Sequence, residues 1–287
     1  MYKLIVSDSE NVRIDKFLSG KVDDLSRSDL SKLFTKNKVL VNNILVKQNY
    51  KVKLNDSIDI DYEVVKFDIN NQTELPIIYQ DDSVVVIDKP AGILSHSKGK
   101  ENQEQTVETM VHSLLTDNDY DRAGIVHRLD RATSGVMICA KTKDSYKWLQ
   151  SQFSQRKVIK VYYAIVSGHF DIKSAIIDLP IMRDQKNKSR FKVDSRGKAS
   201  ITQYTVISEN PMYSLIELVP KTGRTHQLRV HLKYLKHPIV GDNFYDGEPS
   251  DRLYLHASKL SIRLISGESK TFESKMPEEF NEKMKYN

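Results

Sequence analysis

Short β-branched and aromatic segments recur from residue 77 onward and limit the folds open to this 287-residue chain. Most of them alternate apolar and polar residues, as strands buried on one face do. Few of the stretches between them are long enough for the crossover helices that parallel neighbours require. The sequence therefore predicts an α+β fold whose mixed sheet is mostly antiparallel, with helices packed on it. The expected strands run over 83–88, 135–141, 160–166, 201–207, 213–219 and 252–260, and the expected helices over 107–115, 142–156 and 226–236.

A separate small module is predicted at the N-terminal end. Residues 14–18 carry apolar side chains at the spacing of one helix face, and residues 26–34 begin with the spacing of a capping box. Asn42-Asn43 between two apolar runs predicts a hairpin turn, and a further strand pair is expected around Asn55-Asp56. We therefore expect a module over 1–65, a linker over 66–76 and a second domain over 77–287.

The module also has an uneven charge. Six lysines and no acid occur over residues 30–54, and Arg27 lies shortly before this stretch. A basic face of this kind suits contacts with the phosphates of a nucleic acid, with Arg27 and Lys32 as candidate contacts. An ordinary solvated surface explains the same pattern, and the charge alone favours that interpretation.

The composition excludes several classes of protein. Lys and Arg number 44 against 38 Asp and Glu, and the resulting net charge of +6 is compatible with a nucleic-acid partner but does not establish one. No apolar run approaches the roughly 18 residues that a membrane helix needs, and the start of the chain lacks the pattern of a secretory leader. We therefore expect a cytoplasmic protein without a membrane partner. The single cysteine, Cys139, excludes an internal disulfide framework and a multi-cysteine metal site.

Motifs for cofactors are missing from the sequence. It contains no phosphate-binding glycine loop, no dinucleotide fingerprint and no nucleophile elbow. His226, His231 and His237 are spaced so that they do not share one helix face, as a metal-binding pair at i and i+4 would. The sequence therefore predicts neither a cofactor nor a metal site. We also expect a monomer without an obligate protein partner.

A polar loop between two apolar runs concentrates candidate site residues. Residues 124–126 and a second run from Gly135 predict two strands, and function concentrates on loops that such strands hold. The arginines that flank Asp130 are expected to keep its carboxylate ionised and available as nucleophile or base. A structural ion pair in a hydroxyl-rich turn is the alternative, and these residues alone do not decide between the two. The candidate residues of the loop are His127, Arg128, Asp130 and Arg131.

Two basic stretches follow the loop. Residues 221–236 contain five lysines or arginines and no acid, with leucines at the spacing of one buried helix face. Arg229 lies beside that face and is placed to reach a buried acid. Residues 183–198 carry seven cations against two acids and predict a charged hairpin, whose contact with phosphates stays open.

These segments resemble the motifs of the RluA-type pseudouridine synthases. HRLDRATSG resembles the family's catalytic loop and makes Asp130 the essential residue, and SVVVIDKPAGILSH resembles the motif before it. KVYYAIVSG is similar to the segment that carries the active-site tyrosine, here Tyr162. KTGRTHQLRVHL followed by HPIVGDNFY resembles the last motif, whose arginine faces the aspartate, here Arg229. The N-terminal module resembles a small RNA-binding domain named after a ribosomal small-subunit protein (S-four-like).

The resemblance implies an isomerase that converts uridine in structured RNA to pseudouridine without a cofactor. Asp130 would act on the nucleoside as nucleophile or by removing a sugar proton, with Arg229 paired to it. Tyr162 would lie against the uracil ring and help to remove the proton at carbon 5. Arg128 would enter the gap left by the flipped base. The candidate RNA contacts in the loop are then His127, Arg128 and Arg131.

Substrate and catalysis both leave alternatives. By analogy with family members that carry the N-terminal module, large-subunit ribosomal RNA is the expected substrate, with transfer RNA as the alternative. A non-catalytic RNA-binding or ribosome assembly factor would not need Asp130, Tyr162 and Arg229 together. A nucleic-acid hydrolase would need paired carboxylates or a metal cluster, and neither accompanies Asp130 in the sequence.

Overall fold

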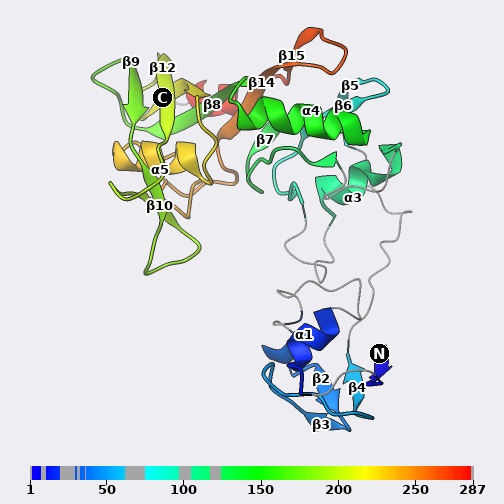
Figure 1. Cartoon of the computed structure of the whole chain (residues 1–287). Coiled ribbons are helices and arrows are strands. Elements are labelled where there is room, and N and C mark those ends of the chain that lie inside the picture. Colours follow the sequence, from blue (N-terminus) through cyan, green and yellow to red (C-terminus); the bar gives the residue numbers. More distant parts are fainter. Residues whose placement is uncertain are drawn as a thin grey trace. The chain divides into compact units, whose positions relative to one another are not determined.

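The computed structural model describes residues 2–7, 11–19, 30, 33–35, 37–61, 75–96, 105–116 and 124–285. These residues form two compact units, the first ending at residue 61 and the second beginning at residue 75 (Figure 1). The predicted linker over 66–76 falls almost wholly outside the described residues, as do Arg27 and Lys32. The domain boundaries and these two RNA contacts therefore stay predictions.

The first unit is a four-stranded antiparallel sheet with helix α1 (Ile14–Ser19) and its own core. The order of its strands is β1 (Tyr2–Ile5), β4 (Ser57–Ile60), β2 (Val39–Val41) and β3 (Ile44–Leu45). The predicted hairpin at Asn42-Asn43 is confirmed, and both asparagines have the positive φ that its turn requires, 51° and 66°.

The predicted strand pair around Asn55-Asp56 is wrong in its pairing. The strand after the turn, β4, pairs with β1 and β2. The residues before the turn bond elsewhere, because Val52 donates its N–H to the carbonyl of Val12 and accepts from the N–H of Asn11. The capping box expected at Ser26 lies outside the described residues.

The second unit is built on a nine-stranded sheet, and all neighbouring strands described in it are antiparallel except β7 and β14. This confirms the predicted α+β class and the mostly antiparallel pairing. The six predicted strands correspond to β6, β7, β8, β12, β13 and β14. In sheet order the strands are β5 (Ile77–Gln80), β6 (Val84–Lys89), β7 (Ser134–Ala140), β14 (Leu255–Arg263), β8 (Ile159–Ser167), β13 (Tyr213–Pro220), β12 (Ile201–Glu209) and β9 (Ser174–Asp178), with β15 (Ser269–Glu273) beside β14.

Helices cover both faces of this sheet. Val136 and Ile138 of β7 pack with α4 (Lys143–Ser154), whereas the alternate residues Met137 and Cys139 pack with α3 (Val107–Val111), which continues into the short helix η2 (His112–Leu114). The predicted helices over 107–115 and 142–156 are therefore confirmed, and α6 (Glu278–Lys285) adds a helix near the C-terminus. No helix in the described part of the chain is both long and apolar enough to cross a membrane.

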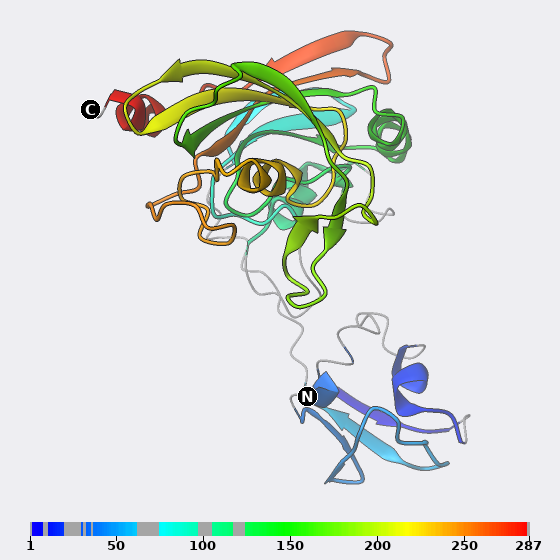
Figure 2. The ribbon, with the colours of Figure 1, turned by 90° about the vertical axis from the view of Figure 1, so that its left-hand side faces the viewer.

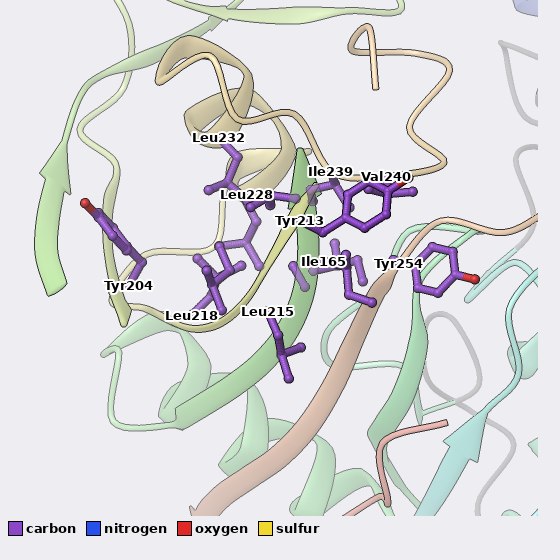
Figure 3. Packing of buried hydrophobic residues seen from close by; sticks show 14 of the residues in the cluster. Ile165, Tyr204, Tyr213, Leu215, Leu218, Leu228, Leu232, Ile239, Val240 and Tyr254 are labelled. Atoms are coloured by element: carbon purple, nitrogen blue, oxygen red, sulfur yellow. The ribbon is translucent and has the colours of Figure 1, made fainter. Parts of the chain in front are cut away.

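Helix α5 (Gln227–Tyr234) lies on the hollow side of the curved sheet (Figure 2) and confirms the predicted helix over 226–236. Its Leu228 and Leu232 point into the core toward the strands that carry Leu218 and Ile165 (Figure 3). The charged hairpin is also present, formed by β10 (Ile181–Arg183) and β11 (Phe191–Val193), and it extends away from the sheet near α5 (Figure 1).

The strand expected over 124–126 is wrong. Only Ile125 forms a bridge, to Cys139 of β7. The chain then turns away, and the ring of His127 replaces a backbone carbonyl by accepting a hydrogen bond from the N–H of Ile138 at 3.0 Å. The loop that begins here is therefore fixed to β7 by a side chain rather than by a strand ladder.

Candidate active site

Asp130 lies in the loop that leads into β7, and the segment after β6 holds the backbone of this loop. Ser95 Oγ donates to the carbonyl of Leu129 at 2.8 Å and accepts from the N–H of Leu129 at 3.0 Å. The N–H of Gly92 donates to the carbonyl of Arg131 at 2.8 Å. Backbone hydrogen bonds on both sides of Asp130 thus set the direction of its side chain.

A fully buried lysine fixes the same segment. The ammonium of Lys89, at the end of β6, donates to the carbonyls of Pro90 and Ile93 at 2.8 Å and of Arg131 at 3.2 Å. Burial lowers the pKa of Lys89 to about 8, while the negative charge of Asp130 opposes this shift. A buried ammonium is tolerated only with such acceptors, so Lys89 ties the loop of Asp130 to β6.

Arg229, in the first turn of α5, joins Asp130 to a second acid. Its Nη1 donates to Asp130 Oδ2 at 3.2 Å, while Nε and Nη2 donate to the two oxygens of Asp242 at 2.7 and 2.8 Å. Burial by itself lowers the pKa of Arg229, but the hydrogen bonds and charges of Asp242 and Asp130 outweigh it and raise that pKa. The guanidinium is therefore a permanent cation at a fixed position beside Asp130.

Asp242 is a site residue that the sequence analysis missed, although it predicted a buried acid for Arg229. Its carboxylate also accepts from the N–H groups of Phe244 and Tyr245 at 3.1 Å. The turn that presents it depends on Gly241, which has a φ of +80° and where a Cβ would overlap the carbonyl oxygen of Arg252. A glycine followed directly by an acid indicates a turn in the sequence, but it does not identify the acid as the partner of Arg229.

His226 is the third group near Asp130, with Nε2 at 3.8 Å from Asp130 Oδ2. The hydroxyl of Tyr245 accepts from the N–H of Phe191 at 3.0 Å and forms a second hydrogen bond with His226 Nδ1 at 2.7 Å. This contact fixes the orientation of the ring, so that Nε2 is the ring nitrogen that faces Asp130. Burial lowers the pKa of His226, and the charge of Asp130 opposes this shift.

Tyr162 lies on β8 and lines the same cavity as Asp130 and Arg229. The structure therefore brings together the three residues predicted to be catalytic. Burial raises the pKa of Tyr162, and the nearby charge of Asp130 raises it further. Tyr162 is accordingly a neutral phenol in the free protein.

The loop residues predicted to contact RNA differ in their surroundings. His127 is half-buried, its ring stacks on Phe153 at 4.5 Å, and burial lowers the pKa of His127 to about 3. It is therefore neutral and tied to the protein through Ile138. Arg128 and Arg131 are exposed, and Arg128 lines the cavity together with His127.

A cavity of about 430 Å³ contains these groups. This volume lies within the range of about 300–1,000 Å³ that is usual for small-molecule sites. Among the described residues, its walls carry one carboxylate, Asp130, and six lysines or arginines, and no cluster suited to a metal ion is present in the described part of the chain. The cavity thus suits an anionic ligand. The six cations are Arg128, Arg156, Lys160, Lys221, Arg224 and Arg229.

Known proteins are similar to this chain in sequence and in fold. Residues 83–234 match the family model for RNA pseudouridylate synthase. The protein named ribosomal large subunit pseudouridine synthase D of Borreliella burgdorferi is 37% identical over 287 residues, which cover 94% of this chain and 87% of that protein. The chain belongs to the RluA-type pseudouridine synthases.

Other members of the family support this assignment. Ribosomal large subunit pseudouridine synthase C of Vibrio cholerae is 30% identical, with 93% of this synthase and 90% of that protein covered. The solved structure of human RNA pseudouridylate synthase domain containing 1 superposes with a TM-score of 0.61 at 26% identity, over 71% of this chain and 85% of that one. Human RNA pseudouridylate synthase domain containing 4 gives a TM-score of 0.58 at 28% identity, over 72% and 90%.

Family membership makes this pseudouridine synthase an RNA isomerase. The reaction breaks the bond from ribose C1′ to uracil N1 and joins C1′ to uracil C5. The proton on C5 leaves and N1 gains one, so substrate and product have the same atoms and electrons. The chemistry therefore needs a group that acts on the nucleoside and a space in which the base can turn.

Proposed function

We propose that this synthase isomerises specific uridines in large-subunit ribosomal RNA, with Asp130 as its catalytic carboxylate. The observation that carries the role of Asp130 is its ion pair with Arg229, at 3.2 Å, inside a cavity that Tyr162 also lines. The relatives from Borreliella burgdorferi and Vibrio cholerae both have ribosomal large subunit in their names, which supports this class of RNA.

The two oxygens of Asp130 differ in their surroundings. Arg229 and His226 both approach Oδ2, and no described residue donates a hydrogen bond to Oδ1. Oδ1 is then the oxygen that acts on the nucleoside. It either attacks C1′ and forms a glycosyl ester as N1 leaves, or removes the proton from C2′ so that the bond from C1′ to N1 breaks and the sugar becomes a glycal. Arg229 holds the carboxylate ionised and oriented for either route.

Tyr162 packs against the uracil ring in this proposal. Because burial and Asp130 raise its pKa, Tyr162 enters the reaction as a phenol. It can accept the proton from C5 only after its own proton has moved to another group. Its first contribution is therefore a flat, apolar surface against which the freed base rotates.

Arg128 takes the place of the uridine that leaves its helix. It is exposed and lines the cavity, and its planar guanidinium can both stack on bases and donate hydrogen bonds. His127 and Arg131 flank the path of the RNA in the same loop. The N-terminal module, with Arg27 and Lys32, supplies contacts with RNA phosphates further from the reacting nucleotide.

The proposal is tested by mapping pseudouridine in cellular RNA with carbodiimide and primer extension, in wild-type cells and in cells that lack this gene. We expect sites in large-subunit ribosomal RNA to disappear and to return with the wild-type protein but not with Asp130→Asn. Sites lost only from transfer RNA would contradict the proposed substrate. The absence of any lost site would indicate a non-catalytic RNA-binding factor.

A further inference from the structure

We propose that the cavity contains a phosphate subsite formed by Lys160, which binds a phosphodiester next to the flipped uridine. The proposal rests on the proposed function for one assumption, that the target nucleotide binds in this cavity. It gives a separate role to a side chain that lies outside the group formed by Asp130, Arg229, His226 and Tyr162.

Lys160 shares a face of β8 with Tyr162. Residues two apart on a strand point to the same side, and Val158, Lys160 and Tyr162 all line the cavity. The strand rise separates the Cα atoms of Lys160 and Tyr162 by about 7 Å. A base against Tyr162 thus leaves the sugar-phosphate backbone within reach of Lys160.

The ammonium of Lys160 has no counter-charge in the described protein. It is half-buried, and no described residue accepts a hydrogen bond or forms an ion pair with its Nζ. Burial lowers the pKa of Lys160, and no carboxylate opposes this shift. The only acid on the cavity wall among the described residues, Asp130, is paired with Arg229. An anionic ligand would supply the missing partner.

The surroundings of Nζ leave room for that ligand. A Cβ built on Gly223, across the cavity from β8, would lie 3.7 Å from Lys160 Nζ, so the ammonium reaches the loop before α5. Because Gly223 has no side chain, none lies between its backbone and the ammonium. A compact ammonium binds phosphate as a point charge and needs no fixed direction of approach.

The other cations of the cavity are engaged or exposed. Arg229 is bound to two carboxylates, and Arg224 donates Nε to the carbonyl of Ala199 at 3.2 Å. The side chains of Arg128, Arg156 and Lys221 are exposed, so water solvates them without a ligand. Lys160 has lost solvation through burial without gaining a partner among the described residues, so an RNA phosphate would stabilise it more than the other cations. We therefore assign the subsite to Lys160.

The test uses an RNA fragment around a uridine that the wild-type enzyme modifies, whichever RNA that proves to be. Two further fragments carry one uncharged methylphosphonate, either 5′ or 3′ of that uridine. Single-turnover rates are measured for the wild type, Lys160→Met, Lys160→Arg and Lys157→Met. Lys157 is an exposed lysine before β8 that does not line the cavity, and it serves as the matched control.

For the wild type and Lys157→Met, we expect one of the two methylphosphonates to slow the reaction about ten- to a hundredfold, the usual worth of a charge-assisted hydrogen bond. Lys160→Met should be slower by a similar factor on unmodified RNA and insensitive to that methylphosphonate. Lys160→Arg should recover part of the rate, which a defect of folding would not allow.

Equal sensitivity of the wild type and Lys160→Met to both methylphosphonates would overturn the phosphate subsite. So would a wild type that is insensitive to both. Either result leaves the proposed function intact, because that function is judged by turnover of the unmodified fragment, by the dependence on Asp130 and by the identity of the mapped RNA.

Discussion

Two arginine–carboxylate pairs of this protein have the same bidentate geometry and differ in burial. Arg229 donates Nε and Nη2 to the oxygens of Asp242 at 2.7 and 2.8 Å, and Arg196 donates the same atoms to Asp194 at 3.0 Å each. The side chains of Arg229 and Asp242 are 10% and 1% exposed, whereas those of Arg196 and Asp194 are 68% and 14% exposed. Comparing Asp242→Asn with Asp194→Asn therefore tests how much the burial of the arginine matters.

Asp242→Asn keeps the shape of the side chain but replaces an acceptor oxygen by a donor amide. Arg229 then loses at least one hydrogen bond and keeps a buried positive charge that only Asp130 balances. Breaking a buried ion pair from one side costs about 3–5 kcal/mol. For a unit of roughly 150–250 residues, each kcal/mol lowers the Tm by about 2–4 °C, so the expected fall is about 6–20 °C.

Asp194→Asn is the matched control. Because Arg196 is solvated, it loses little when its partner changes, and we expect the Tm of this variant to stay at the wild-type value within error. Differential scanning calorimetry of the wild type and both variants, at one pH and salt concentration, measures the difference. Equal shifts for the two variants would refute the argument that burial makes the Arg229–Asp242 pair important for stability.

Three further predictions concern RNA binding and pH. Arg128→Ala should slow single turnover of structured RNA more than that of a short flexible RNA, because only the former needs help in flipping; equal losses would count against this role. Removing residues 1–65 should weaken RNA binding and lower its dependence on salt in filter-binding assays, and an unchanged slope would show that the lysines of the module do not contact phosphates. His127 has a folded pKa of about 3, below the unfolded value of roughly 6.5. The unfolded state therefore binds more protons between these values, and the stability of the wild type should fall as the pH drops through this window. His127→Gln provides an amide oxygen that can accept from Ile138. In urea unfolding, its free energy of unfolding should depend less steeply on pH in this window, by the equivalent of up to one bound proton. A pH dependence identical to that of the wild type would contradict a neutral His127 ring in the folded state.

Hydrophobic periodicity predicted the central strands and missed those at the edges. Strands such as β6 and β7 are buried almost throughout, and their apolar runs are visible in the sequence. The outer strand β9 and the strand β15 beside β14 each have five residues, of which one is buried, so they carry almost no pattern. The expected strand over 124–126 failed for another reason, since a tertiary hydrogen bond from Ile138 to His127 replaces the ladder.

For the site, local sequence indicated the residues, and the family resemblance was needed to pair Arg229 with Asp130. The arginines next to Asp130 in the chain suggested that they hold its charge, whereas the structure shows the pair with Arg229, which lies 99 residues away, as the resemblance implied. Asp242 escaped notice because nothing near it in the sequence reveals that Arg229 folds onto it. Contacts of this kind depend on how α5 packs on the sheet, which short motifs do not encode.

The most direct test of the account is release of tritium from large-subunit ribosomal RNA transcripts labelled at C5 of uridine. Purified wild-type protein should release tritium with a stoichiometry that matches the mapped sites. Asp130→Asn, which is nearly isosteric, should release none while binding the same transcript with wild-type affinity. Release by Asp130→Asn at the wild-type rate would contradict the central claim that the carboxylate held by Arg229 performs the isomerisation.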